Sequence, residues 1–228
     1  MRHQLAAASS APGNFPDVSE SLALALGAAI SPIPLTISIL LLSQPDRGRA
    51  KALAFAAGQV LALSIISVAL WLLLNKTVGA QHHDSKTSAP IDIALGALLV
   101  LLAARKLFTK PKPKKQKPKK QRSLAAEFVF GAGLMAINIE TLALIVASIK
   151  ALATSKSGVA TDALGLVLIV LIATVTATVP PLVTFAAPKQ SGRALKWLNE
   201  QTTKHQRAIS IGFLLFFGAY LLFKGLSG

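Results

Sequence analysis

One acidic and two neutral polar residues lie close together in a strongly apolar stretch of the chain, at Asn138, Glu140 and Thr141. Glu140 is the only acidic residue that the sequence places deep within such a stretch. A charged side chain at the bilayer centre costs roughly 2.5–3.5 kcal/mol even on insertion-based scales, so it is usually protonated, paired or hydrated. We predict a proton-coupling or ligand-binding role for Glu140. The alternative is a neutral carboxylic acid that hydrogen-bonds the backbone of a broken helix.

A second irregularity, Ser-Pro-Ile-Pro at 31–34, interrupts an earlier apolar stretch about halfway along. Each of Pro32 and Pro34 removes a backbone donor and clashes with the preceding turn, which costs roughly 3 kcal/mol in a helix interior. We therefore expect a broken helix there. Asn138 and Thr141, three residues apart, share a helix face and are candidates to bond the carbonyls that the break leaves open. For these two residues and for Ser31, packing chemistry alone is the other interpretation.

Both irregularities fall within apolar stretches long enough to cross a membrane. Crossing takes about 20 apolar residues, and lipid requires that every backbone polar group be satisfied internally, which favours helices. The chain has 228 residues, of which 53% are hydrophobic, and its mean hydropathy is +0.58. We predict an all-α integral membrane protein with six transmembrane helices. The predicted spans are 19–43, 50–74, 90–108, 124–149, 160–187 and 208–226.

The distribution of basic residues predicts the orientation. There are 24 Lys and Arg residues against 9 Asp and Glu, a net charge of +15. Most of the basic residues fall in the connections after the first, third and fifth predicted spans, which all lie on one side. The positive-inside rule puts these connections in the cytoplasm and both termini outside. We predict a multi-pass protein of the cytoplasmic membrane and no nucleic-acid partner, because the charges lie between runs too apolar for water.

Three spans on either side of a basic segment predict two inverted three-helix repeats, the plan of many secondary transporters. We expect a flexible N-terminal tail at 1–18, a first repeat at 19–108, a basic cytoplasmic linker at 109–123 and a second repeat at 124–228. The first helix of each repeat would then be disturbed near the bilayer midplane. Discontinuous helices in matching positions indicate a transport site.

The linker has two interpretations. Its prolines and like charges keep it extended, and it either fixes the topology on anionic headgroups or docks a cytoplasmic partner or anionic lipid. The docking residues would be Lys114, Lys115, Lys117, Lys119 and Lys120. A later loop, 193–200, interleaves apolar and charged residues and predicts a short interfacial helix with Trp197 at headgroup level.

Two further patterns concern helix shape. Pro180 and Pro181 predict a bend in the fifth span, where hinge function is the alternative to packing alone. Small residues at a spacing of four in the second span predict a close helix approach. They are Ala50, Ala54, Gly58 and Ala62.

Several kinds of site are not expected. The chain has no cysteine, which excludes thiolate metal sites and thiol redox chemistry. His82 and His83 lie beside Asp84 in an outer loop without further ligands, so no metal site is predicted. The sequence contains no phosphate-binding Gly-rich loop and no hydrolase motif. We therefore expect a protein that is not an enzyme and needs no cofactor.

Six predicted spans in a 3+3 arrangement, the Ser-Pro-Ile-Pro motif and the basic linker resemble the lysine-exporter (LysE) superfamily. Within it, the segment 22–58, with LALALGAAISPIPLTISILLLS and KALAFAAGQV, resembles the GAP family, the glycolipid- or peptidoglycolipid-addressing proteins of mycobacteria and relatives. This resemblance covers about residues 20–226 and implies export or positioning of cell-envelope glycolipids. The family usually has Asn-Pro-Lys where this chain has Asn138-Ile139-Glu140, so the second break and the substrate can differ here.

Three hypotheses follow. The first is a lipid or glycolipid exporter, driven by a proton gradient or by a partner machine. The second is an efflux carrier for a small solute such as an amino acid or cation, and the third is a membrane scaffold for a lipid-biosynthesis complex. The thiol-transporting relatives are excluded by the absence of cysteine. The expected partners are membrane lipids, a glycolipid substrate, export or lipid-biosynthesis proteins, and a second copy of the chain.

Overall fold

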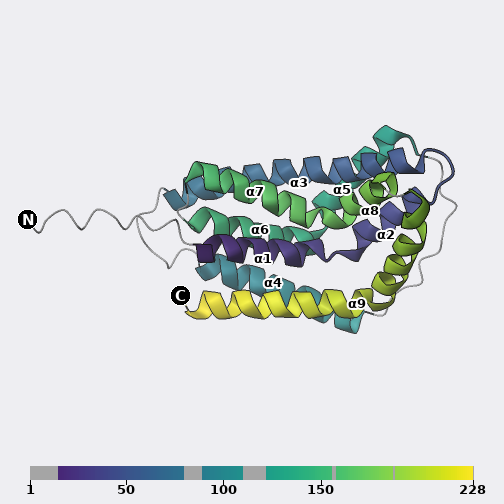
Figure 1. Cartoon of the computed structure of the whole chain (residues 1–228). Coiled ribbons are helices and arrows are strands. Elements are labelled where there is room, and N and C mark those ends of the chain that lie inside the picture. Colours follow the sequence, from purple (N-terminus) through teal and green to yellow (C-terminus); the bar gives the residue numbers. More distant parts are fainter. Residues whose placement is uncertain (1–14, 80–88, 110–121, 156–157, 187, 228) are drawn as a thin grey trace, which may run out of the picture.

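The computed structural model describes residues 15–79, 89–109, 122–155, 158–186 and 188–227, and every element in these ranges is a helix. The helices are α1 (Phe15–Ala29), α2 (Pro32–Leu42), α3 (Gly48–Gly79), α4 (Ala89–Phe108), α5 (Leu124–Ile137), α6 (Ile139–Thr154), α7 (Val159–Ala173), α8 (Val175–Ala186) and α9 (Pro188–Ser227). They form an elongated bundle (Figure 1). The start of α1 and the end of α9 lie at the same end of this bundle, which we call the terminal end. We call the opposite end, where α3 and α5 begin, the basic end.

The helices have the lengths and composition of membrane spans. Two qualify alone, over Gly48–Asn75 in α3 and Arg207–Ser227 in α9, and three bent pairs raise the number to five within the described residues. Helix α4 is long enough but carries Asp92, Arg105 and Lys106. The apolar helices identify a membrane protein. Six spans, the inverted repeat and the side on which the termini lie stay predictions.

The predicted break in the first span is confirmed. Helices α1 and α2 meet at a bend of 53°, and Ser31 between them has an extended conformation. Pro32 and Pro34 are the first and third residues of α2. The first N–H groups of a helix have no intrahelical acceptor, so proline costs little at these positions. The motif therefore ends one helix and starts the next. Helix α1 begins at Phe15, before the predicted Ser19, and residues 1–14 of the predicted tail lie outside the described residues.

The fourth predicted span is also broken, although it lacks a proline. Helices α5 and α6 meet at 69° around Asn138, whose backbone φ of −82° and ψ of 81° are not helical. The Asn138 side chain accepts a hydrogen bond from the Thr141 backbone N–H at 3.4 Å. Asparagine is one of the preferred N-cap residues because it satisfies such a free donor. Asn138 thus restarts the helix by capping.

The break in the fifth predicted span corrects our expectation. The bend of 71° separates α7 from α8 at Thr174, whereas Pro180 and Pro181 lie inside α8. Pro181 has no N–H to donate to the Ala177 carbonyl one turn earlier. The Ser38 hydroxyl of α2 donates to that carbonyl instead, at 3.0 Å. Because a neighbouring helix satisfies the freed acceptor, α8 continues through its prolines.

The two halves of the chain are interleaved. The most extensive helix contacts pair α4 with α9, α3 with α5 and α1 with α6, so each joins a helix of the first half to one of the second. The predicted close approach along α3 is confirmed at Gly58, where an added Cβ would overlap the Phe128 carbonyl of α5. Gly131 of α5 meets the Phe55 carbonyl of α3 in the same way. Glycine allows the two backbones to touch.

Helix α9 corrects another expectation. The segment 193–200 is not a separate short helix, because α9 runs without interruption from Pro188 to Ser227. Its first part crosses the basic end of the bundle and its second part lies along α4 (Figure 1). Trp197, on the first part, is 61% exposed. The exposed indole agrees with the predicted surface position.

Candidate functional site

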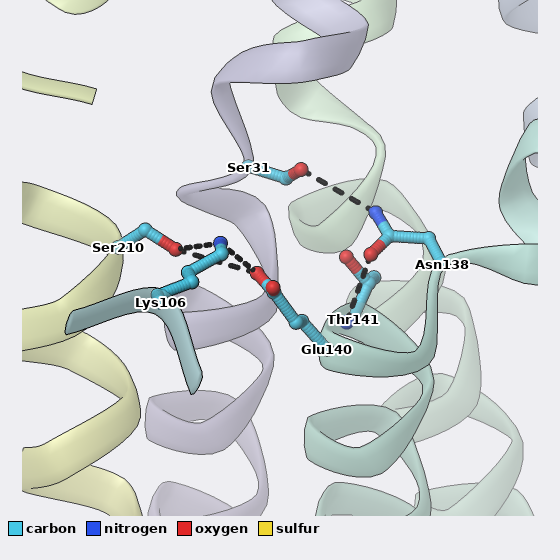
Figure 2. Close-up of polar contacts among 6 residues, drawn as sticks. All are labelled: Ser31, Lys106, Asn138, Glu140, Thr141 and Ser210. Carbon is cyan, nitrogen blue, oxygen red and sulfur yellow. Dashed lines mark hydrogen bonds and ion pairs between the residues drawn. The ribbon is translucent and has the colours of Figure 1, made fainter. Parts of the chain in front are cut away.

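The two central breaks meet in the structure. The Asn138 amide donates through Nδ2 to the Ser31 hydroxyl at 3.4 Å (Figure 2). Ser31 is the residue between α1 and α2, and Asn138 is the residue between α5 and α6. We expected Asn138 and Thr141 to bond carbonyls around the prolines. Asn138 bonds a hydroxyl and a backbone N–H instead, because the prolines lie in the first turn of α2, where donors rather than acceptors are in excess.

Glu140 forms the polar centre of this region. It lies in the first turn of α6, where the helix dipole favours a negative charge. Its Oε2 accepts from the Lys106 ammonium at 2.5 Å and from the Ser210 hydroxyl at 3.3 Å. Lys106 also donates to the Ser210 hydroxyl at 2.6 Å, so the three side chains form a closed triangle (Figure 2). The triangle joins α4, α6 and α9.

Arg207 of α9 contacts the end of α4 that carries Lys106. Its guanidinium donates to the backbone carbonyls of Lys106 and Leu107 at 2.6 and 2.9 Å. These carbonyls belong to the last turn of α4, which has no intrahelical donors for them. A cation at a helix C-terminus is also favoured by the dipole. Arg207 therefore fixes the end of α4 that presents Lys106 to Glu140.

A small cavity lies beside Glu140. Its lining residues come from α1, the first break, α6 and α9, and they are Gly27, Ala28, Ile30, Ser31, Glu140, Thr141, Leu144, Ser210, Phe213 and Leu214. Its volume is about 20 Å³, which is enough for about one water molecule. The Glu140 side chain is 31% exposed and that of Lys106 34%. The pair is therefore accessible to water or protons, while the cavity is too small for a lipid headgroup.

The structure brings together only some of the predicted site residues. Ser31, Asn138, Glu140 and Thr141 share one region, and Thr141 is buried there. Pro32 and Pro34 form the start of α2, directly after Ser31. The remaining predictions lie elsewhere. Pro180 and Pro181 are in α8, whereas Lys114, Lys115, Lys117, Lys119, Lys120, His82 and His83 lie outside the described residues.

Sequence reasoning missed Lys106, Arg207 and Ser210. Lys106 and Arg207 lie at the ends of the predicted spans 90–108 and 208–226, where a charge count treats Lys and Arg as loop residues. Ser210 carried no signal, since single serines are common in membrane helices. A useful signal for Lys106 was its position within the last turn of α4, where a long side chain can reach back along the bundle.

Three further acidic residues are buried in the bundle, near the starts of the third, fourth and fifth predicted spans. Asp92, Glu127 and Asp162 are 4%, 4% and 7% exposed, which makes each of them more buried than Glu140. All three lie in the first turn of a helix, where the dipole stabilises a carboxylate. Lys150, which directly follows the predicted span 124–149, is buried beside Asp92, with Nζ and Oδ2 2.6 Å apart. The polar residues within the bundle therefore extend well beyond Glu140.

The site has the chemistry of a charge pair rather than of a metal centre. Within the described ranges, no three His, Cys, Asp or Glu side chains are placed to hold a metal ion. A partly exposed carboxylate beside an ammonium can bind the opposite charges of a ligand. Removal of either charge would also weaken a contact between the two halves of the chain.

The matched protein family covers this whole region. A family model described as Sap, sulfolipid-1-addressing protein, matches residues 22–227. The chain belongs to the Sap family. This confirms the predicted membership of a Sap-like group of glycolipid-addressing proteins. Neither the curated proteins nor the solved structures gave a significant match.

The extent of the Sap family match bears on the site. It includes both central breaks and every residue that lines the cavity. The Lys106–Glu140 pair and Arg207 also lie inside it. The candidate site is therefore part of the region that defines this chain as a Sap family member. The wider relationship to the lysine-exporter superfamily stays a prediction.

Proposed function

We propose that this protein moves a cell-envelope lipid or glycolipid outward across the cytoplasmic membrane. Membership of a family described as sulfolipid-1-addressing supports the lipid class. The observation that carries a transport role is the Lys106–Glu140 pair, which lies beside two broken helices and joins the two halves of the chain. Broken helices at a repeat interface are the usual position of a transporter's binding site.

The proposed mechanism links protonation to separation of the two halves. A proton on Glu140 would remove its charge and weaken its attraction to Lys106. The cavity beside Glu140 holds about one water molecule, so a headgroup can enter only when the halves move apart there. Glu140, Lys106 and Ser210 would then bind the polar part of the cargo, and apolar helix faces would accommodate its acyl chains. The proton gradient would supply the energy.

The test compares surface-exposed and whole-cell lipids with and without the gene. We expect one glycolipid class that is still synthesised but is lost from the surface. Glu140→Gln should reproduce this loss at normal expression. Glu200→Gln is the matched control, because Glu200 is an exposed acid on the first part of α9 and lies away from the cavity. Full surface lipid in Glu140→Gln would remove the proposed role of this carboxylate.

A second candidate function is efflux of a small zwitterionic solute. The opposite charges of Lys106 and Glu140 match those of an amino acid, and a small solute would need the halves to move apart less than a lipid headgroup would. If surface lipids do not change when the gene is removed, uptake of amino acids into everted vesicles becomes the deciding measurement. For a scaffold of lipid-biosynthesis proteins, deletion of 110–121 should abolish function, whereas a transporter should retain most of its activity.

A further inference from the structure

A second and larger cavity lies at the basic end of the bundle. Its volume is about 700 Å³, and we call it the basic cavity. Its lining residues are Pro45, Asp46, Arg47, Lys51, Arg122, Ser123 and Leu124. They come from the turn before α3, the first turn of α3 and the start of α5. The basic cavity shares no lining residue with the one beside Glu140.

Lys51 is the most informative residue of this cavity. It is only 6% exposed, and its ammonium donates to the neutral Gln44 Oε1 at 2.9 Å. Among the described residues, no carboxylate forms an ion pair with it. A buried ammonium without a counter-charge is costly. An anion in the cavity would supply that charge.

The surrounding groups also favour an anion. Arg47 and Arg122 add two guanidinium groups, which bind phosphate or sulfate through paired N–H donors. The lining includes the starts of α3 and α5, which lie at the same end of the bundle (Figure 1). The positive ends of two helix dipoles attract anions. Two acids oppose this: Asp46 lines the cavity, and Glu127 lies 3.9 Å from Arg122. The three basic groups still outnumber them.

The backbone at Arg47 is consistent with a constrained binding loop. Its φ is 51°, and it is the only residue other than glycine with a positive φ in the described part of the chain. The left-handed conformation is unfavourable for a residue with a Cβ and persists only where its surroundings impose it. The Arg47 carbonyl accepts from the Lys51 N–H at 3.0 Å. Arg47 and Lys51 both line the cavity.

We propose that the basic cavity binds a tetrahedral oxyanion, a phosphate or sulfate ester, on the headgroup of a lipid. The identity of that lipid as cargo rests on the proposed function, whereas oxyanion binding does not. Cargo bound here would lie at the opposite end of the bundle from the start of α4 (Figure 1), whose first turn carries Asp92. The cavity beside Glu140 would be a later position on its route.

The experiment measures lipid binding to the purified full-length chain by native mass spectrometry. The probes are phosphatidic acid, inorganic phosphate and inorganic sulfate. Phosphatidylcholine is the comparison lipid, because it has no net charge. We expect phosphatidic acid to bind and phosphatidylcholine not to compete. Arg47→Gln, Lys51→Gln and Arg122→Gln should each weaken binding about tenfold, because each removes a charge-assisted hydrogen bond. Lys204→Gln, which removes an exposed charge from α9, should leave binding unchanged.

Three results would overturn the proposal. Equal weakening by Lys204→Gln would show a general charge effect, and unchanged binding in the cavity variants would place the lipid elsewhere. Binding of inorganic phosphate or sulfate without binding of phosphatidic acid would rule out a lipid headgroup. Arg47 and Arg122 are exposed, so their variants keep the test valid if Lys51→Gln does not fold. Binding is measured without transport, so this proposal and the surface-lipid test of Glu140→Gln can fail separately.

Discussion

Lys150 of α6 and Asp92 of α4 form an ion pair in which only 6% of each side chain is exposed. It joins the second half of the chain to the first. Two more exposed ion pairs also join the halves. Lys224 of α9 lies 2.6 Å from Glu20 of α1, and Lys106 of α4 pairs with Glu140 of α6. Every one of these three pairs has one partner in each half. Ion pairs within the bundle therefore connect the two halves at three separate positions.

Removal of one partner from the buried pair should destabilise the protein strongly. Asp92→Asn removes the carboxylate that pairs with the buried Lys150 ammonium, and breaking a buried pair in this way costs about 3–5 kcal/mol in the free energy of unfolding. Asp92→Leu combined with Lys150→Met should recover most of this loss, because no charge is left buried. Glu20→Gln is the control, and its more exposed pair should contribute less than about 1 kcal/mol. Thermal unfolding in detergent measures all of these variants.

Asn138→Ala should loosen the second break. It removes the side-chain acceptor of the Thr141 N–H and the donor to Ser31. Loss of an N-cap costs about 1 kcal/mol. Asn138→Ser keeps a capping oxygen and should retain most of the stability. Equal melting temperatures for the alanine variant and the wild type would show that the cap contributes nothing.

Gly131→Ala should disrupt the contact between α3 and α5. The new methyl group would overlap the Phe55 carbonyl, and forcing extra volume into a packed interface costs about 1–3 kcal/mol. Gly133→Ala is a control on the same helix, where an added Cβ would meet no atom within 4 Å. It should be neutral, or stabilising by up to about 1 kcal/mol through helix propensity. Similar losses in both variants would contradict the proposed contact.

Ser38 and Pro181 should be coupled energetically. Ser38→Ala removes the donor to the Ala177 carbonyl, and a buried acceptor left unsatisfied costs about 1–3 kcal/mol. Pro181→Ala restores a backbone N–H one turn later, so Ser38→Ala should cost much less in that background. Ser43→Ala, which loses only a hydroxyl bond to the Ile39 carbonyl of its own helix, is the control. Additive losses in the double variant would contradict this coupling.

Local chemistry made the first break predictable. Pro32 and Pro34 predict this break, because proline has no N–H and cannot continue a preceding helix. The residue type of Asn138 is compatible with a helix cap, but the sequence does not show whether its backbone leaves the helical conformation. The break there could therefore not be predicted with the same certainty. Pro180 and Pro181 predict the third bend at the wrong position, because α8 continues through them. Their freed carbonyl is satisfied by Ser38, which is 139 residues away from Ala177 and invisible to any local pattern.

The charge pairs were less predictable than the helices. Lys106 and Lys150 both stand near helix ends, where a count of loop charges assigns them to the aqueous sides. Their partners, Glu140 and Asp92, lie in other helices. Only the way in which the helices pack determines whether such a charge faces water or a partner. The family resemblance identified the kind of protein correctly, whereas the residues that surround Glu140 required the fold.

The interleaved packing has a consequence for biogenesis. Helices α1, α3 and α4 leave the ribosome before α5, α6 and α9, the helices against which they pack. Asp92 and Lys106 are therefore synthesised before their partners Lys150 and Glu140. A nascent chain of three helices has neither its packing partners nor its counter-charges, so it must be held by the insertion machinery or by lipid headgroups. Assembly of the bundle follows insertion, and it is completed only when α9 has joined α4.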